Sequence, residues 1–99
     1  MPRRNRNKLE IMMDIMEACR EGSRKTRIMY TANLSYELTK KYISEMEKMG
    51  LIIKREEDGE MFFLTERGRN LLDKLRKYRS LREEYMRLND DLRRNLNKS

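Results

Sequence analysis

The segment from residue 66 to residue 96 constrains the fold of this chain more than any other feature. After Gly68 it contains neither glycine nor proline, so nothing in it interrupts a single helix. Large apolar residues recur along it at steps of three or four: Leu71, Leu75, Tyr78, Leu81, Tyr85, Leu88, Leu92 and Leu96. The mean step of about 3.6 residues predicts one apolar stripe along a helix of about 45 Å.

A stripe of this length must be covered, and the rest of the chain offers little apolar surface. The chain has 99 residues, of which 37% are hydrophobic and 41% charged. A domain this small can cover the stripe only to about Tyr78. We therefore expect the remainder to pair with a second copy in a two-chain coiled coil, and the alternative is a helix that folds back over its own domain. The predicted dimerisation residues are Tyr78, Leu81, Tyr85, Leu88, Leu92 and Leu96.

Three shorter helices are predicted before the long one. Residues 8–21 carry an apolar stripe of Leu9, Met12, Ile15, Met16 and Cys19, and Gly22 ends the helix. Residues 24–32 form a second helix, with Ser23 or Thr26 as its N-cap. Residues 36–49 form a third, capped by Ser35, and its predicted core-facing residues are Leu34, Leu38, Tyr42, Met46 and Met49.

A hairpin follows the third helix. Residues 51–55 and 61–64 have strand character, and Asp58-Gly59 lies between them, which is a strong signal for a tight turn. Thr65 then caps the long helix. This order is typical of a mainly α, α+β winged helix-turn-helix with a two-stranded wing and an appended coiled-coil helix. The predicted units are a flexible basic arm (1–7), the winged domain (8–65) and a dimerisation helix (66–99).

The net charge of +7 suggests a polyanionic partner, with nucleic acid first. Three i,i+4 pairs are expected to neutralise part of the positive charge of the long helix: Asp73–Lys77, Glu83–Arg87 and Asp90–Arg94. No apolar run is long enough for a membrane span. With one cysteine and no histidine, we expect no disulfide, metal site, cofactor or enzymatic activity, and a reducing cytoplasmic location. Cys19 is interpreted as a small buried hydrophobe.

Three groups of residues are candidates for DNA contact. The first lies on or beside the third helix: Ser35, Tyr36, Lys40, Lys41, Ser44 and Lys48. The second is at the start of the second helix: Arg24, Lys25 and Arg27. The third is in the arm, which could enter a minor groove or remain a solvated tail: Arg3, Arg4 and Arg6. Ser35 could be a cap alone, the lysines could be solvated, and Tyr36 could stack on a sugar or cover the domain edge.

These residues predict weak sequence preference. The outer face of the third helix has no asparagine, glutamine or arginine to read base edges, and lysines act mainly as point charges. The wing tip carries Glu56, Glu57, Asp58 and Glu60, which DNA repels, so we do not assign it as a contact. The expected function is low-specificity binding of double-stranded DNA. The alternatives are a sequence-specific transcription regulator and a protein-interaction module.

A resemblance sharpens this interpretation. The run KTRIMYTANLSYELTKKYI, from Lys25 to Ile43, resembles the ten-kilodalton "a" class of archaeal winged-helix DNA-binding proteins. KLEIMMDIMEAC, from Lys8 to Cys19, and FFLTERGRNLL, from Phe62 to Leu72, are also similar. The resemblance implies a chromatin-associated homodimer, joined by an antiparallel coiled coil, that binds double-stranded DNA with little sequence preference.

Overall fold

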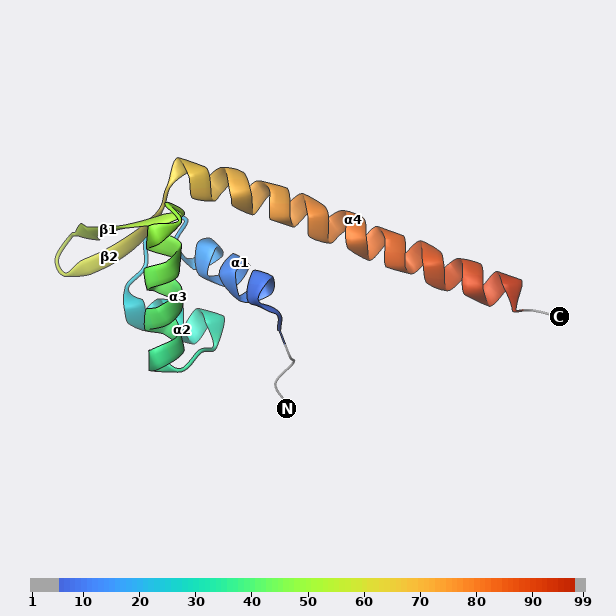
Figure 1. Ribbon diagram of the computed structural model, residues 1–99, viewed down its shortest axis with the longest axis horizontal. Helices are drawn as coiled ribbons and strands as arrows, with labels where there is room; N and C mark the ends of the chain where they lie inside the picture. Colours follow the sequence, from blue (N-terminus) through green and yellow to red (C-terminus); the bar gives the residue numbers. More distant parts are fainter. Residues whose placement is uncertain (1–5, 98–99) are drawn as a thin grey trace.

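The computed structural model describes residues 6–97, in which α4 projects from a small helical domain with a hairpin on its other side (Figure 1). The elements are α1 (Lys8–Ala18), α2 (Lys25–Ala32), α3 (Tyr36–Lys48), β1 (Ile52–Glu56), β2 (Glu60–Leu64) and α4 (Glu66–Leu96). The molecule measures 65 × 32 × 20 Å because most of α4 extends beyond the domain. The predicted winged-helix fold class is confirmed.

Side-chain caps start three of the helices. The Ser35 hydroxyl accepts a hydrogen bond from the Leu38 amide at 3.2 Å, as predicted. The Thr65 hydroxyl accepts one from the Gly68 amide at 3.0 Å, which confirms the start of α4. The Asn7 side chain and Glu10 form a reciprocal capping box at α1, which the sequence analysis did not predict.

The predicted cap of α2 and the predicted end of α1 are wrong. Arg24 occupies the N-cap of α2 and makes no side-chain cap bond, while the Ser23 hydroxyl donates to the Ala18 carbonyl at 2.5 Å. The chain leaves α1 after Ala18, so that the backbone of Ser23 can pair with Phe62 of β2 through bonds of 2.9 and 2.8 Å. Pairing with the hairpin therefore sets both boundaries.

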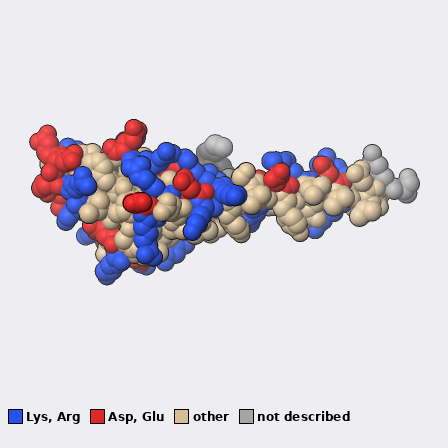
Figure 2. Space-filling view, turned by 90° about the horizontal axis from the view of Figure 1, so that it is seen from above, with Lys and Arg blue, Asp and Glu red and all other residues tan. Residues whose placement is uncertain are grey.

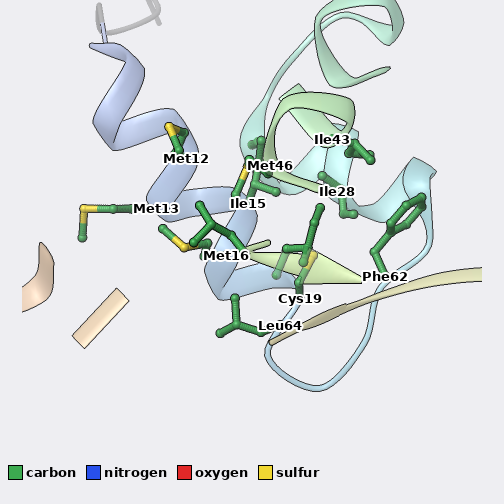
Figure 3. Packing of buried hydrophobic residues seen from close by; sticks show 14 of the residues in the cluster. Met12, Met13, Ile15, Met16, Cys19, Ile28, Ile43, Met46, Phe62 and Leu64 are labelled. Atoms are coloured by element: carbon green, nitrogen blue, oxygen red, sulfur yellow. The ribbon is translucent and has the colours of Figure 1, made fainter. Parts of the chain in front are cut away.

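The hydrophobic core lies between α1, α2, α3, the hairpin and the first turns of α4 (Figure 3). Its fully buried members include Ile15, Met16, Ile28 and Met46. The predicted stripe of α1 is confirmed except at Leu9, which is 41% exposed. Met13, which was not predicted to face the core, is buried.

The predicted inner face of α3 is confirmed in part, since Met46 is buried and Leu34 and Tyr42 pack partly buried against the core. Leu38 and Met49 are exposed, while Thr39 and Ile43 are buried beside Met46. Thr39 tolerates full burial because its hydroxyl donates to the Ser35 carbonyl at 2.8 Å, which leaves its methyl group to pack as an apolar group. The orientation of α3 is set by its packing against α2 and β1. The spacing of apolar residues along the helix does not determine it alone.

The hairpin forms where the sequence predicts it. β1 and β2 are antiparallel, with Ile52 opposite Leu64 and Glu56 opposite Glu60. Asp58 and Gly59 have φ values of 56° and 104°, a left-handed geometry that suits an Asp-Gly turn.

α4 packs on the domain only through its first turns. Leu72 is buried, Leu71 and Leu75 are partly buried, and Arg76 forms an ion pair with Glu17 of α1. From Tyr78 onward the apolar residues are exposed, which excludes the alternative of a helix folded back on its own domain (Figure 1).

The three i,i+4 ion pairs predicted along α4 do not form within residues 6–97. Arg94 instead pairs with Asp91, at 3.5 Å and i,i+3 spacing. Exposed pairs gain too little energy to hold two long side chains in one geometry. The basic charge of α4 is therefore less neutralised than the sequence suggested.

Candidate nucleic-acid interface

One face of α3 is free of contact with the core and carries the predicted DNA-binding residues of that helix. Lys40, Lys41, Ser44 and Lys48 are exposed on it, opposite the buried face. Tyr36 lies at its first turn and is 53% exposed. Glu37 and Glu47 of α3 are exposed as well, so lysines outnumber glutamates by three to two and the exposed surface of α3 is modestly basic.

The structure joins two lysines that the sequence placed in separate groups. The ammonium nitrogen of Lys25, from α2, lies 5.9 Å from the centroid of the Tyr36 ring. That of Lys40, from α3, lies 5.3 Å from the same centroid. Both distances are within the range of cation–π attraction, so the ring holds two positive charges from two helices.

The other two members of the α2 group lie elsewhere. The Arg24 guanidinium donates to the Glu57 carbonyl of the wing at 3.4 Å. Arg27 lies beside the end of α1 and the start of α4, in a hollow that it shares with Arg20 and Arg69. Side chains at neighbouring positions of a helix point in different directions, so Arg24, Lys25 and Arg27 do not form one cluster.

The basic arm is only partly described. Arg3 and Arg4 lie outside the described residues. Arg6 forms an ion pair with Asp14 and donates to the Ala32 carbonyl. Its guanidinium is thus bound to the folded domain, unlike the flexible arm that was expected at this position.

Lys54 is a basic residue of this region that the sequence analysis did not assign. It follows buried Ile52 by two positions in β1, so both side chains lie on the same face of the hairpin. Its ammonium nitrogen is 3.6 Å from the Glu60 carboxylate. Because side chains alternate between the two faces of a strand, the spacing of two residues from Ile52 could have predicted that Lys54 lies on the same face.

Acidic residues gather at the tip of the wing. Figure 2 shows red side chains concentrated at the hairpin end of the molecule, while blue side chains spread over the rest of this face. The exposed acids there are Glu56, Glu57, Asp58 and Glu60. The charge of the domain is therefore divided between an acidic wing tip and the basic surface of α3.

Comparison with known proteins gives the family. A model of the winged helix-turn-helix family matches residues 5–83. The chain belongs to this family. The protein MJ0287 of Methanocaldococcus jannaschii, described as uncharacterized, is 39% identical over 74 residues, which are 74% of this chain and 73% of that protein.

Solved structures agree with this assignment. Sso10a-2, described as a DNA-binding protein from Sulfolobus solfataricus, has a TM-score of 0.84 and 27% identity, over 95% of this chain and 100% of that one. A MarR family transcriptional regulator from Silicibacter pomeroyi has a TM-score of 0.62 and 19% identity, over 83% of this chain and 60% of that one, and shows the fold alone.

These findings confirm the resemblance to archaeal winged-helix DNA-binding proteins. The family matched is a winged helix-turn-helix family and not a family of enzymes, and Sso10a-2, which shares the fold, is described as a DNA-binding protein. Within residues 6–97, no helix has the length and apolarity that crossing a membrane requires.

Proposed function

We propose that this protein binds double-stranded DNA with little sequence preference, as a homodimer, and organises the chromosome in the cytoplasm. The observation that carries the proposal is the basic outer face of α3, with Lys40, Lys41 and Lys48 exposed in a winged helix-turn-helix domain. In such domains the second helix of the motif enters the major groove. Ser35, Tyr36 and Ser44 complete this contact surface.

Low specificity follows from the chemistry of the α3 surface. Its lysines attract phosphates but lack the planar fork with which arginine recognises guanine. Ser44 can hydrogen-bond a phosphate or several bases, so it distinguishes bases poorly. The affinity should therefore come mainly from phosphate contacts and should fall steeply with salt.

The homodimer is supported by the uncovered stripe on α4. Its apolar residues are about half exposed or more from Tyr78 to Leu92, and Leu96 is 81% exposed. If a second α4 runs antiparallel along this stripe, the facing pairs are Leu71–Leu96, Leu75–Leu92, Tyr78–Leu88 and Leu81–Tyr85. Every member of the stripe then has an apolar partner, and the DNA-binding domains (8–65) lie at opposite ends of the paired α4 helices.

The decisive test measures duplex affinity against salt for random and genomic fragments side by side. We expect equal affinities and a steep negative slope of log affinity against log salt. A fragment bound much more tightly than the rest would favour a sequence-specific regulator. Absence of binding at low salt would overturn DNA binding altogether and favour a protein-interaction module.

Single substitutions locate the contact surface. Lys40→Ala and Lys41→Ala should each reduce the magnitude of the salt slope by about one, because each removes one phosphate contact. Lys77→Ala, on the exposed side of α4, removes the same charge away from α3 and should leave the slope unchanged. Equal effects of all three substitutions would show that the contact surface is not on α3.

A further inference from the structure

A hollow of about 220 Å³ lies between α2, α3 and the wing. Three lysines from three elements line it: Lys25 of α2, Lys40 of α3 and Lys54 of β1. The Ser44 hydroxyl group is also part of its lining. These three positive charges exceed the two negative charges of Glu47 and Glu60, which line the same hollow. The net positive charge and the hydrogen-bonding hydroxyl suit a single phosphate group of the DNA backbone.

One of the two carboxylates in this hollow is already paired with a lysine. Glu60 forms the 3.6 Å ion pair with Lys54, whereas Glu47 forms no ion pair within residues 6–97. In the hairpin Lys54 is directly opposite Phe62, and Glu60 is two residues from Phe62, so Lys54 and Glu60 are diagonal neighbours on one face. Phe62 is buried against the core, which holds this face toward α3.

We propose that Glu60 is a built-in competitor for the DNA phosphate in this hollow, and that it limits the affinity of the protein for DNA. The inference rests on the proposed function and assigns Lys54 and Glu60 a role in it. A carboxylate carries the same unit charge as a backbone phosphate and accepts the same charge-assisted hydrogen bonds. Lys54 exchanges one anionic partner for another when DNA binds, so it adds little to the net affinity.

The geometry permits this exchange. The side chains of Lys54 and Glu60 are 49% and 50% exposed, so the ion pair is weak and accessible. Lys25 and Lys40 form no ion pair with a carboxylate among the described residues, and the ammonium groups of both lie near the Tyr36 ring.

The test compares Glu60→Gln with the wild-type protein in duplex binding at several salt concentrations. The substitution keeps the shape of the side chain and releases Lys54 for phosphate. We expect tighter binding at low salt and a slope steeper by about 0.9, which is the contribution of one further phosphate contact. The advantage of the variant should therefore shrink about threefold to fourfold between 50 and 200 mM salt.

Glu57→Gln is the matched control, since it makes the same change of charge at the wing tip. The Glu57 side chain forms no ion pair within residues 6–97. This control should therefore show only the small effect of the altered net charge. Equal gains for Glu57→Gln and Glu60→Gln would overturn the inference.

A second comparison isolates Lys54. In the wild-type background Lys54→Gln should change the affinity little, because Glu60 already neutralises Lys54. In the Glu60→Gln background it should abolish the gain. A gain that persists in the double variant would overturn the inference while leaving the proposed function intact, whereas absence of wild-type binding would instead overturn the proposed function.

Discussion

At the residue scale, burial in the core makes the Cys19 thiol unreactive. It is fully buried, as the sequence predicted, and burial raises the pKa of its thiol from 9.0 to about 12. The neutral thiol packs as a small hydrophobe beside the end of α1. The thiolate, which is the reactive form, is strongly disfavoured while the protein is folded.

This pKa shift predicts a loss of stability at high pH. Above pH 9 the unfolded chain loses the Cys19 proton while the folded chain keeps it, so the free energy of unfolding falls as pH rises toward 12. The fall attributable to Cys19 should approach about 1.4 kcal/mol per pH unit. Urea unfolding of the wild type and of Cys19→Ala between pH 8 and 10.5 measures it, because other titrating groups are common to both. Parallel pH profiles would contradict the assignment.

Gly68 is required for close packing between α4 and the hairpin, which its low helix propensity alone would not indicate. A Cβ atom at Gly68 would lie 2.2 Å from the carbonyl oxygen of Leu51 and 2.6 Å from a Leu64 methyl group. Such distances are impossible without movement of α4 away from the hairpin. Glycine is therefore used here for close packing, although it weakens a helix interior.

Gly68→Ala should destabilise the protein by about 1–3 kcal/mol, the cost of overpacking a core, despite the better helix propensity of alanine. Urea unfolding at a fixed protein concentration measures the change. Ser80→Ala, at an exposed position of the same helix, should be neutral or slightly stabilising. If Gly68→Ala were also stabilising, propensity rather than packing would govern this position.

At the scale of elements, α4 has an inner part that packs on the domain and an outer part that is exposed. Its first turns pack on the domain, but within residues 6–97 no apolar side chain of α4 beyond Tyr78 is buried by contact with the rest of the chain. A helical segment of this length is marginal in water when isolated. The proposed pairing with a second copy would supply the missing burial.

Leu88→Asp should convert the dimer to a monomer, because it puts a charge in the centre of the proposed apolar interface. Sedimentation velocity at micromolar concentration should show the change of mass. Far-ultraviolet circular dichroism should show a partial loss of helix, and amide hydrogen exchange should place that loss in the outer part of α4. Ser80→Asp puts the same charge on another face of α4 and should leave the dimer intact. A wild-type monomer at this concentration would refute the proposed interface.

At the scale of the whole molecule, two basic α3 surfaces at the ends of a rigid helical pair would bind DNA together. Once one domain is bound, the second binds at a high effective concentration. The acidic wing tips and the proposed Glu60 competitor would keep each single contact weak. The affinity for long DNA would then depend more on simultaneous binding by the two domains than on the affinity of either domain alone.

The dimeric arrangement predicts that the monomeric variant Leu88→Asp binds a long duplex about 100-fold more weakly than the wild type. The salt slope should fall to about half, because half of the phosphate contacts are lost. Fluorescence anisotropy with a long duplex measures both quantities. On a duplex too short for two domains, the wild type and the variant should bind alike. Equal binding on the long duplex would show that the domains act independently.

The sequence by itself determined the order of the elements, two helix caps, the hairpin turn and the length of the apolar stripe. These features depend on local physics, namely capping by Ser35 and Thr65, left-handed geometry at Asp58-Gly59 and side-chain periodicity within α4. Each involves residues that are close along the chain. They could therefore be predicted without knowledge of the packing.

Only the tertiary structure decided which distant residues meet. Packing oriented α3 so that Thr39 is buried instead of Leu38, and brought Lys25 and Lys40 to one Tyr36 ring. It also separated Arg24 from Lys25 and directed Lys54 with Glu60 toward α3. These contacts join side chains from different elements, whose relative orientation depends on how the whole core fills space. The candidate site is therefore more a product of packing than of any single motif.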